Sequence, residues 1–167
     1  MRIWLDTEFQ EDGRCIDLIS IALVGEDDRR LHLASSDYDE SLANDWLRQN
    51  VLQHLAGVPR LPRAQIRDSI IGFVGAERPE FWAYFGEYDW IVLRQLFGDM
   101  FAWPQGWPLL CMDVEQWRLQ LDVGDGALPR QLSAPHDALN DAIWTRLVWQ
   151  HLRKVEDTRH DPASRAG

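Results

Sequence analysis

Three strand-like segments follow one another within residues 1–34, and this run constrains the fold more than any other part of the chain. We expect strands over residues 2–6, 16–24 and 29–33, because each segment is largely apolar and turn-forming residues such as Asp12 and Gly13 separate them. Connections this short cannot carry a parallel crossover. The sequence therefore predicts an antiparallel meander at the start of the chain.

The rest of the chain alternates between helical and strand-like patterns. Apolar residues recur at helical spacing in five segments, residues 41–53, 63–74, 88–97, 114–121 and 137–154. Two short apolar runs supply further strands, residues 81–85 and 109–112. Residues 59–62 (PRLP) should break the chain between the first two helices. We predict an α/β fold with a mixed five-stranded sheet, an antiparallel meander followed by parallel strands, flanked by helices.

The length of 167 residues is typical of one domain, which we place at residues 1–154. The polar tail, residues 155–167, is expected to be disordered. No apolar run is long enough for a membrane span, and Arg2 leads directly into a strand-like segment rather than a signal peptide. Cys15 and Cys111 lie in apolar stretches typical of core thiols in a reducing compartment. We therefore expect a cytoplasmic protein without membrane association.

The net charge of −10, from 27 acidic and 17 basic residues, argues against a protein that grips duplex DNA along its backbone. It does not exclude a nuclease. Carboxylates that hold metal ions count as negative in the sequence but are neutralised when loaded, and an enzyme that takes up a few nucleotides at an end needs no broad basic surface.

The first strand ends in Asp6-Thr7-Glu8, which places two carboxylates two residues apart. In a strand, residues i and i+2 project from the same face. At a separation of about 4 Å and an effective dielectric near 20, the repulsion between Asp6 and Glu8 is on the order of 4 kcal/mol. A divalent cation such as Mg²⁺ or Mn²⁺ would relieve it. A solvated strand end is the alternative for a lone pair of this kind, so acidic partners elsewhere decide between the two.

Asp89 is the first such partner, because it lies just past a predicted strand, at the start of a helix. An acid in this position also acts as a helix cap or as a partner of the helix dipole. In an α/β sheet, however, the carboxyl end of a strand is where sites are usually built.

Asp141 and His136 supply the second acidic element. Asp141 shares a helix side with Ala138 and Ala142, a poor place for an unpaired charge. Five residues along a helix rotate by about 140°, so His136 and Asp141 can face one site only if His136 lies on the loop before the helix. Pro135 permits such a loop. An exposed histidine at a helix start is the alternative.

Taken together, these residues resemble the DEDDh 3′–5′ exonucleases, in the RNase T-like group of the ribonuclease H-like fold. The motifs of that family are D-x-E on the first strand, an aspartate after a central strand, and H-x-A-x-x-D at the last helix. They are matched here by residues 6–8, by Asp89 and by residues 136–141 (HDALND). The resemblance covers residues 1–152. The segments DTEF, EDG, LISI and QIR make the chain most similar to compact exoribonucleases known from mycobacteria, at residues 6–9, 11–13, 18–21 and 65–67.

The resemblance implies two Mg²⁺ or Mn²⁺ ions about 4 Å apart in one active site. Asp6 would bridge them, Glu8 and Asp141 would hold the first ion, and Asp89 would reach the second. His136 would be the general base. The expected reaction is the removal of 5′-mononucleotides from the 3′ end of single-stranded or overhanging RNA, and homodimers are common among such relatives, so we expect one here.

Substrate contacts are expected at Thr7, Glu8, Phe9 and Phe85. Phe9 directly follows the first motif and either stacks on the terminal base or packs in the core. Many relatives carry an asparagine several residues before the second-motif aspartate, whereas residues 83–85 here are AYF. The substrate contacts of this segment therefore cannot be carried over from the family. Arg63 and Arg67 share a helix face and contact either phosphate, solvent or a second subunit.

Three other functions fit parts of the pattern. A DNA-directed 3′–5′ exonuclease would use the same acidic residues. An endonuclease of the ribonuclease H or PIN type also gathers carboxylates around metals, but the placement of His136 five residues before Asp141 disfavours it. A non-catalytic RNA-binding module of the same fold is disfavoured by the complete set of four acids and a histidine.

Overall fold

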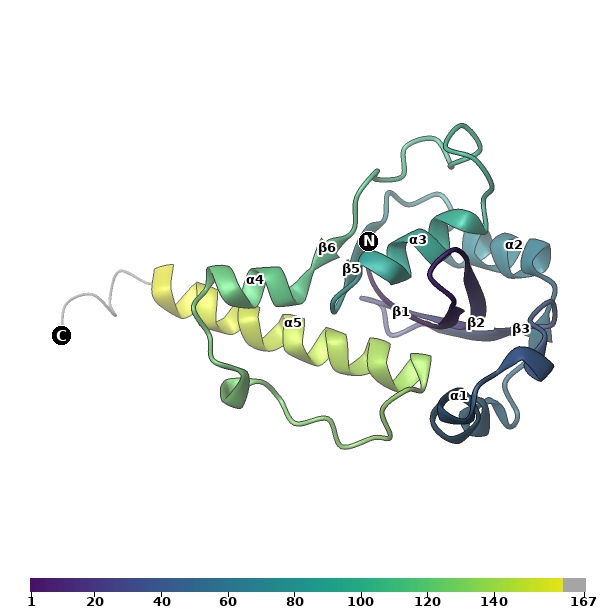
Figure 1. The fold of residues 1–167 in the computed structure, drawn as a ribbon. Helices are drawn as coiled ribbons and strands as arrows, with labels where there is room; N and C mark the ends of the chain where they lie inside the picture. The colour runs from purple at the N-terminus through teal and green to yellow at the C-terminus, as the bar shows by residue number, and fades with distance from the viewer. Residues whose placement is uncertain (161–167) are drawn as a thin grey trace.

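Six strands form one mixed sheet in the order β4-β3-β2-β1-β5-β6 in the computed structural model, which describes residues 1–160 (Figure 1). The strands are β1 Arg2–Glu11, β2 Ile16–Gly25, β3 Arg30–Ser35, β4 Arg60–Leu61, β5 Glu80–Ala83 and β6 Met112–Asp113. β1, β2 and β3 pair antiparallel, while β5 lies parallel to β1 and β6 parallel to β5. The predicted meander followed by parallel strands is confirmed.

The predicted number of five strands is one too low. The additional strand is β4, which pairs in parallel with β3 inside the segment that the two prolines were predicted to break. The prolines flank the strand instead of interrupting it: the carbonyl of Pro59 accepts from the Ala34 N–H at 2.9 Å. Two residues are too short a run for any periodic signal, so only the pairing partner defines this strand.

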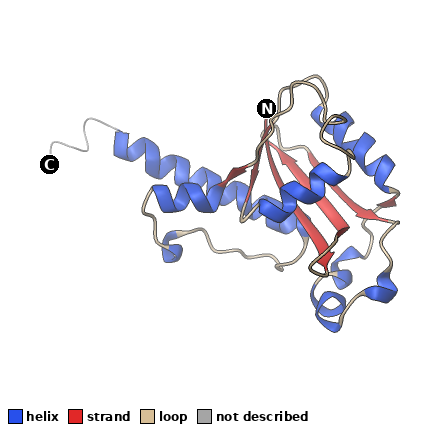
Figure 2. Ribbon diagram, turned by 45° about the horizontal axis from the view of Figure 1, so that its top comes forward, coloured by secondary structure: helices blue, strands red, loops and turns tan. Residues whose placement is uncertain are grey.

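Helices cover both faces of the sheet (Figures 1 and 2). They are α1 Asp45–Asn50, α2 Arg63–Val74, α3 Glu87–Gln95, α4 Val114–Gln120 and α5 Ala138–His160. Short 3₁₀ turns lie at Glu40–Leu42, Leu52–Leu55 and Asp125–Ala127. Helices α2 and α3 pack on one face with Ile3 and Leu5, and α4 and α5 pack on the other face with Trp4.

Two predicted helices need correction. The single helix over residues 41–53 is divided into a 3₁₀ turn, α1 and a second 3₁₀ turn, because Asn44 starts a new helix by accepting the Leu47 N–H at 2.8 Å. Helix α5 continues to His160, so residues 155–160 are helical rather than part of a disordered tail. Ion pairs of Arg153 with Glu156 and Asp157 support these added turns. The rest of the predicted tail, residues 161–167, lies outside the described residues.

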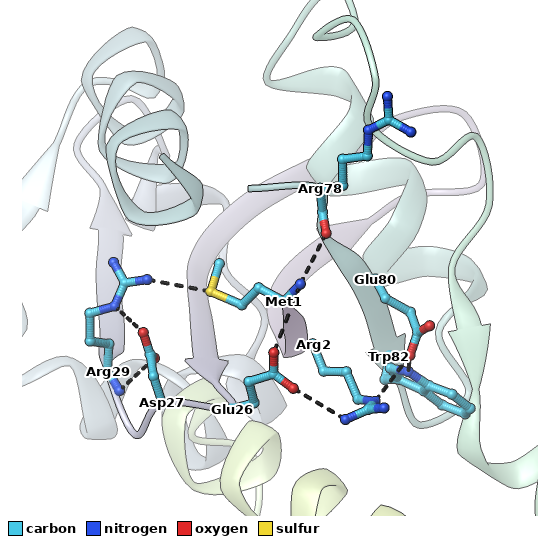
Figure 3. Close-up of polar contacts among 8 residues, drawn as sticks. All are labelled: Met1, Arg2, Glu26, Asp27, Arg29, Arg78, Glu80 and Trp82. Atoms are coloured by element: carbon cyan, nitrogen blue, oxygen red, sulfur yellow. Dashed lines mark hydrogen bonds and ion pairs between the residues drawn. The ribbon is translucent and has the colours of Figure 1, made fainter. Parts of the chain in front are cut away.

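The start of β1 is fixed by a network of polar contacts (Figure 3). Arg2 contacts Glu26 at 3.2 Å and Glu80 at 3.4 Å, and the Trp82 indole N–H donates to Glu80 at 2.6 Å. Half-exposed ion pairs of this kind contribute little stability each, about 0–1 kcal/mol. Their geometric effect is to join β1 to the β2–β3 turn and to β5, in the register that sets Trp4 opposite Trp82.

Two other predictions concern the cysteines and the membrane. Cys15 is exposed, so its prediction as a core thiol is wrong; its apolar neighbours follow it in β2, whereas Cys15 itself ends the turn before that strand. Cys111 is partly buried, and burial raises the pKa of its thiol. Among residues 1–160, no helix is long and apolar enough to cross a membrane.

Candidate active site

Strand β1 directs its residues alternately to the two faces of the sheet. Ile3 and Leu5 contact the core beneath α2 and α3, whereas Trp4 contacts the core beneath α5. The same alternation places Asp6 and Glu8 on the α5 side. The strand continues to Glu11, further than predicted, with a bulge between Glu8 and Phe9. Glu8 is only 9% exposed, so it is not a solvated strand end.

The loop before α5 brings His136 to this face. His136 has a φ of 62°, a left-handed conformation that turns the chain immediately before the helix. Asp137 then starts the helix, because its Oδ1 accepts the Asn140 N–H at 3.0 Å. His136 therefore lies on the loop, as a shared site with Asp141 requires. Ligand atoms of Glu8, His136 and Asp141 all lie within 4.8 Å of one another.

Asp141 is held by two donors from the preceding loop. Its Oδ2 accepts the peptide N–H of His136 at 2.9 Å, and its Oδ1 accepts from the side-chain amide of Gln131. Sequence reasoning missed Gln131, because a glutamine in a loop rich in proline carries no chemical signature. Only the fold brings it to the carboxylate.

Asp89 approaches from the opposite side of β1. It lies in the first turn of α3 and is 6% exposed. Its Oδ1 accepts two hydrogen bonds from Thr7, one from the peptide N–H at 2.7 Å and one from the hydroxyl at 2.6 Å. Gly86 occupies the N-cap position of α3, and no side chain caps the helix there. Asp89 is therefore not a helix cap, which was the alternative prediction from the sequence.

Crowding of the four carboxylates shifts their protonation. Burial and then the charges of Asp89, Glu8 and Asp141 raise the pKa of Asp6 well above its usual value. Burial and neighbouring carboxylates likewise raise the pKa of Glu8 to about 8. The neighbouring charges that raise the pKa values of Asp6 and Glu8 are all carboxylates.

The two helix-borne carboxylates are shifted less strongly. Burial raises the pKa of Asp89 to about 6, against the hydrogen bonds from Thr7, which lower it. Burial also raises the pKa of Asp141, and its bonds from Gln131 and His136 oppose the shift. A set of buried, mutually repelling carboxylate oxygens fits a divalent cation, for which oxygen is the preferred ligand.

A cavity of about 270 Å³ opens onto this cluster. Its lining combines acidic, aromatic and polar side chains, namely Asp6, Tyr84, Gln131, Pro135, His136, Asp141, Trp144 and Thr145. At its edge the Trp46 ring meets the His136 ring edge-on, with centroids 4.8 Å apart and planes at 72°. Trp46 could not be connected with the site from the sequence, because α1 is distant from His136 along the chain.

The remaining predicted contacts lie in different settings. Phe9 stacks on Tyr88, with centroids 5.3 Å apart and planes at 10°, so part of its surface already has a partner. Phe85 is 60% exposed and has a φ of 51°. Arg63 pairs with Asp17, and Arg67 pairs with Asp68 at 2.9 Å.

A mixed sheet with carboxylates on its first strand, on the helix after the neighbouring parallel strand and on the last helix defines a ribonuclease H-like protein with an acidic site. A sequence model of the family described as "3'-5' exoribonuclease Rv2179c-like domain" matches residues 1–153. The chain therefore belongs to this family of 3′–5′ exoribonucleases.

Two curated proteins of Mycobacterium tuberculosis are similar over most of the chain. They are "3'-5' exoribonuclease Rv2179c" from strain ATCC 25618 / H37Rv and "3'-5' exoribonuclease MT2234.1" from strain CDC 1551 / Oshkosh. Each is 38% identical over 154 residues, which cover 85% of this chain and 87% of the relative. The predicted resemblance to exoribonucleases of mycobacterial type is confirmed.

Proposed function

We propose that this protein is a metal-dependent 3′–5′ exoribonuclease that releases 5′-mononucleotides from the 3′ end of single-stranded or overhanging RNA. The observation that carries the proposal is the meeting of Glu8, His136 and Asp141 within 4.8 Å beside the buried carboxylate of Asp6. Membership of the exoribonuclease family supports the same reaction.

Four carboxylates are the residues that would hold metal ions: Asp6, Glu8, Asp89 and Asp141. The donor set fits two Mg²⁺ or Mn²⁺ ions, because all four groups are hard oxygen ligands and their mutual repulsion needs positive charge between them. Ions held there would supply acidification of the attacking water and stabilisation of charge on the leaving oxygen. Asp6 would be a ligand at the centre of the set, because the charges of the other three carboxylates all act on it.

His136 is the group that we assign as general base. Its ring lies beside Glu8 and Asp141, where it can take a proton from a water molecule in the cavity. Trp46 packs edge-on against the ring, and the peptide N–H of His136 donates to Asp141. A positioned general base contributes about 10²–10⁴-fold to a rate.

The substrate end would enter between the exposed aromatic residues around the cavity. Phe85 is the stronger stacking candidate because most of its surface is exposed and only its edge relation to Tyr84, a cavity residue, holds the ring, whereas a face of Phe9 is already stacked on Tyr88. Stacking of a base on an aromatic side chain contributes about 1–3 kcal/mol. Glu8 is then expected to contact the terminal nucleotide through its place on β1, whereas Thr7, the other predicted contact on this strand, is buried and donates to Asp89. The choice of RNA over DNA rests on the names of the relatives.

End-labelled substrates test the proposal. With Mn²⁺, single-stranded RNA labelled at its 5′ end should shorten in single-nucleotide steps, and the same RNA labelled at its 3′ end should give only labelled mononucleotide. DNA of the same sequence should react more slowly. Internal fragments would indicate an endonuclease, faster hydrolysis of DNA a DNA-directed enzyme, and RNA binding without hydrolysis a non-catalytic module. Asp6→Ala is the matched control for contaminating nucleases.

Three broader properties belong to the same proposal. We propose that the chain forms one exonuclease domain, predicted at residues 1–154 and continued by α5 to His160, that two chains form a homodimer, and that the protein acts in the cytoplasm. The family match over residues 1–153 supports a single domain. Analytical ultracentrifugation of the purified chain would test the dimer, since a monomer at micromolar concentration would contradict it.

A further inference from the structure

Thr7 holds the Asp89 carboxylate through two hydrogen bonds to one oxygen. The peptide N–H and the hydroxyl of Thr7 both donate to Oδ1, at 2.7 and 2.6 Å. Both side chains are buried, at 5% and 6% exposure. Within residues 1–160, no hydrogen bond from the protein reaches Oδ2 of Asp89.

Strand geometry explains why Thr7 can do this. Thr7 lies between Asp6 and Glu8, so the alternation of β1 turns its side chain away from theirs and towards α3. Asp89 comes from the first turn of α3, and its charge is the largest one acting on Asp6. One tripeptide therefore supplies two carboxylates to the site and fastens a third.

Helix capping does not account for the contact. The Gly86 N–H at the start of α3 donates to Asp113 at 2.7 Å, so α3 has an acidic partner other than Asp89. The hydroxyl of Thr7 has a single proton, and it is committed to Asp89. Two donors on one carboxylate oxygen prevent rotation of the group and leave the other oxygen available to a cation.

We propose that Thr7 is a positioning residue, which orients Asp89 so that Oδ2 is presented to the metal site shared with Asp6. This inference rests on the proposed function, and it replaces substrate binding as the role of the Thr7 side chain. It separates the middle residue of the D-T-E motif from its acidic neighbours: they would bind the ion, while Thr7 would act through Asp89.

Mn²⁺ binding to the purified full chain, measured by calorimetry, tests the inference without recourse to activity. Thr7→Val removes the hydroxyl at nearly constant volume, and we expect it to weaken Mn²⁺ binding about 10-fold, since a hydrogen bond to a charged group is lost. Thr7→Ser keeps the hydroxyl and should bind within about 3-fold of wild type. Ser35→Ala is a matched control, because it removes a buried hydroxyl in another part of the sheet. The oxygen of that hydroxyl accepts the Asp37 N–H.

A double-mutant cycle with Asp89→Asn separates positioning from a purely structural role. If Thr7 acts through Asp89, Thr7→Val causes no further loss of Mn²⁺ affinity in the Asp89→Asn background. Equal losses in both backgrounds, or wild-type affinity in Thr7→Val, would overturn the inference and leave the proposed function intact. Absence of Mn²⁺ binding by the wild type would overturn both. Thr7→Ala replaces Thr7→Val in the cycle if the valine variant does not fold.

Discussion

The side-chain amide of Gln131 donates to Oδ1 of Asp141 across the loop that carries His136. Oδ2 of the same carboxylate accepts the peptide N–H of His136 at 2.9 Å. The two bonds fasten the loop to the first turn of α5, so the proposed base and a proposed metal ligand share one anchor. Changes at Gln131 should therefore affect both groups.

Gln131→Ala should weaken Mn²⁺ binding by about 10-fold, because Asp141 loses a donor to its charged form. Gln131→Met should weaken it to a similar extent, since methionine keeps the length of the side chain but has no N–H donor. Calorimetry on both variants measures the effect. Gln120→Ala, an exposed glutamine of α4, controls for loss of an amide alone. Wild-type affinity in both Gln131 variants would show that the bond has no role in metal binding.

His136→Ala should lower the single-turnover rate of RNA hydrolysis by about 10²–10⁴-fold, the usual contribution of a general base. His136 is the one imidazole in the cluster that it forms with Glu8 and Asp141 among the described residues. No other side chain of that cluster could replace it as a neutral base. Rapid-quench measurements with saturating RNA and Mn²⁺ give the rate. A loss of only a few-fold would contradict the assignment of His136 as base.

The metal-free protein should lose stability as the pH rises from about 4.5 to about 8. Glu8 has an ordinary pKa of 4.5 and a folded-state pKa of about 8, so the folded chain retains a proton that the unfolded chain releases in this window. The associated stability is fully present below pH 4.5 and is lost as the pH passes about 8, a change on the order of a few kcal/mol. Melting temperatures in EDTA from pH 4.5 to pH 8.5 measure it. Glu8→Gln should flatten the dependence of the melting temperature on pH. A melting temperature that rises with pH in the wild type but not in Glu8→Gln would contradict the raised pKa of Glu8.

Asp6→Asn should abolish activity and at the same time stabilise the metal-free protein at pH 8. The substitution removes a buried carboxylate on which Asp89, Glu8 and Asp141 all act. We expect an increase of about 5 °C in the melting temperature in EDTA, corresponding to roughly 2 kcal/mol. Mn²⁺ should raise the melting temperature of the wild type but not of the variant. A destabilised Asp6→Asn protein would mean that Asp6 serves the fold rather than the site.

Phe85→Ala should raise KM for short RNA by about 10-fold with a smaller effect on stability, because the ring is mostly exposed and its edge-on contact with Tyr84 is the one ring contact it makes among the described residues. Phe9→Ala should instead lower the melting temperature, since its ring packs on Tyr88 and against the core. Steady-state kinetics and thermal unfolding of both variants separate the two roles. An unchanged KM in Phe85→Ala would exclude this residue from base stacking.

The sequence predicts the parts of this fold that depend on local information. Short turns at Asp12-Gly13 and after Gly25 specify the meander, and the two-residue alternation of β1 places Asp6 and Glu8 on one face. The position of His136 before α5 also follows from helix geometry. These features need no knowledge of distant contacts.

Contacts between distant segments account for what the sequence could not predict. Thr7 and Asp89 are 82 residues apart, and the ring of Trp46 meets that of His136 from a helix of only six residues. Strand β4 exists only because Ala34 pairs with Arg60. Neither periodicity nor composition carries such information, because each depends on how the finished sheet brings its edges and loops together.

A crystal soaked with Mn²⁺ and AMP, recorded at the manganese absorption edge, would locate the metal ions and the nucleotide in a single experiment. We predict anomalous peaks bound by Asp6, Glu8, Asp89 and Asp141, with His136 facing the phosphate of the nucleotide. Manganese that binds elsewhere, or a cluster that stays free of metal at millimolar Mn²⁺, would contradict it.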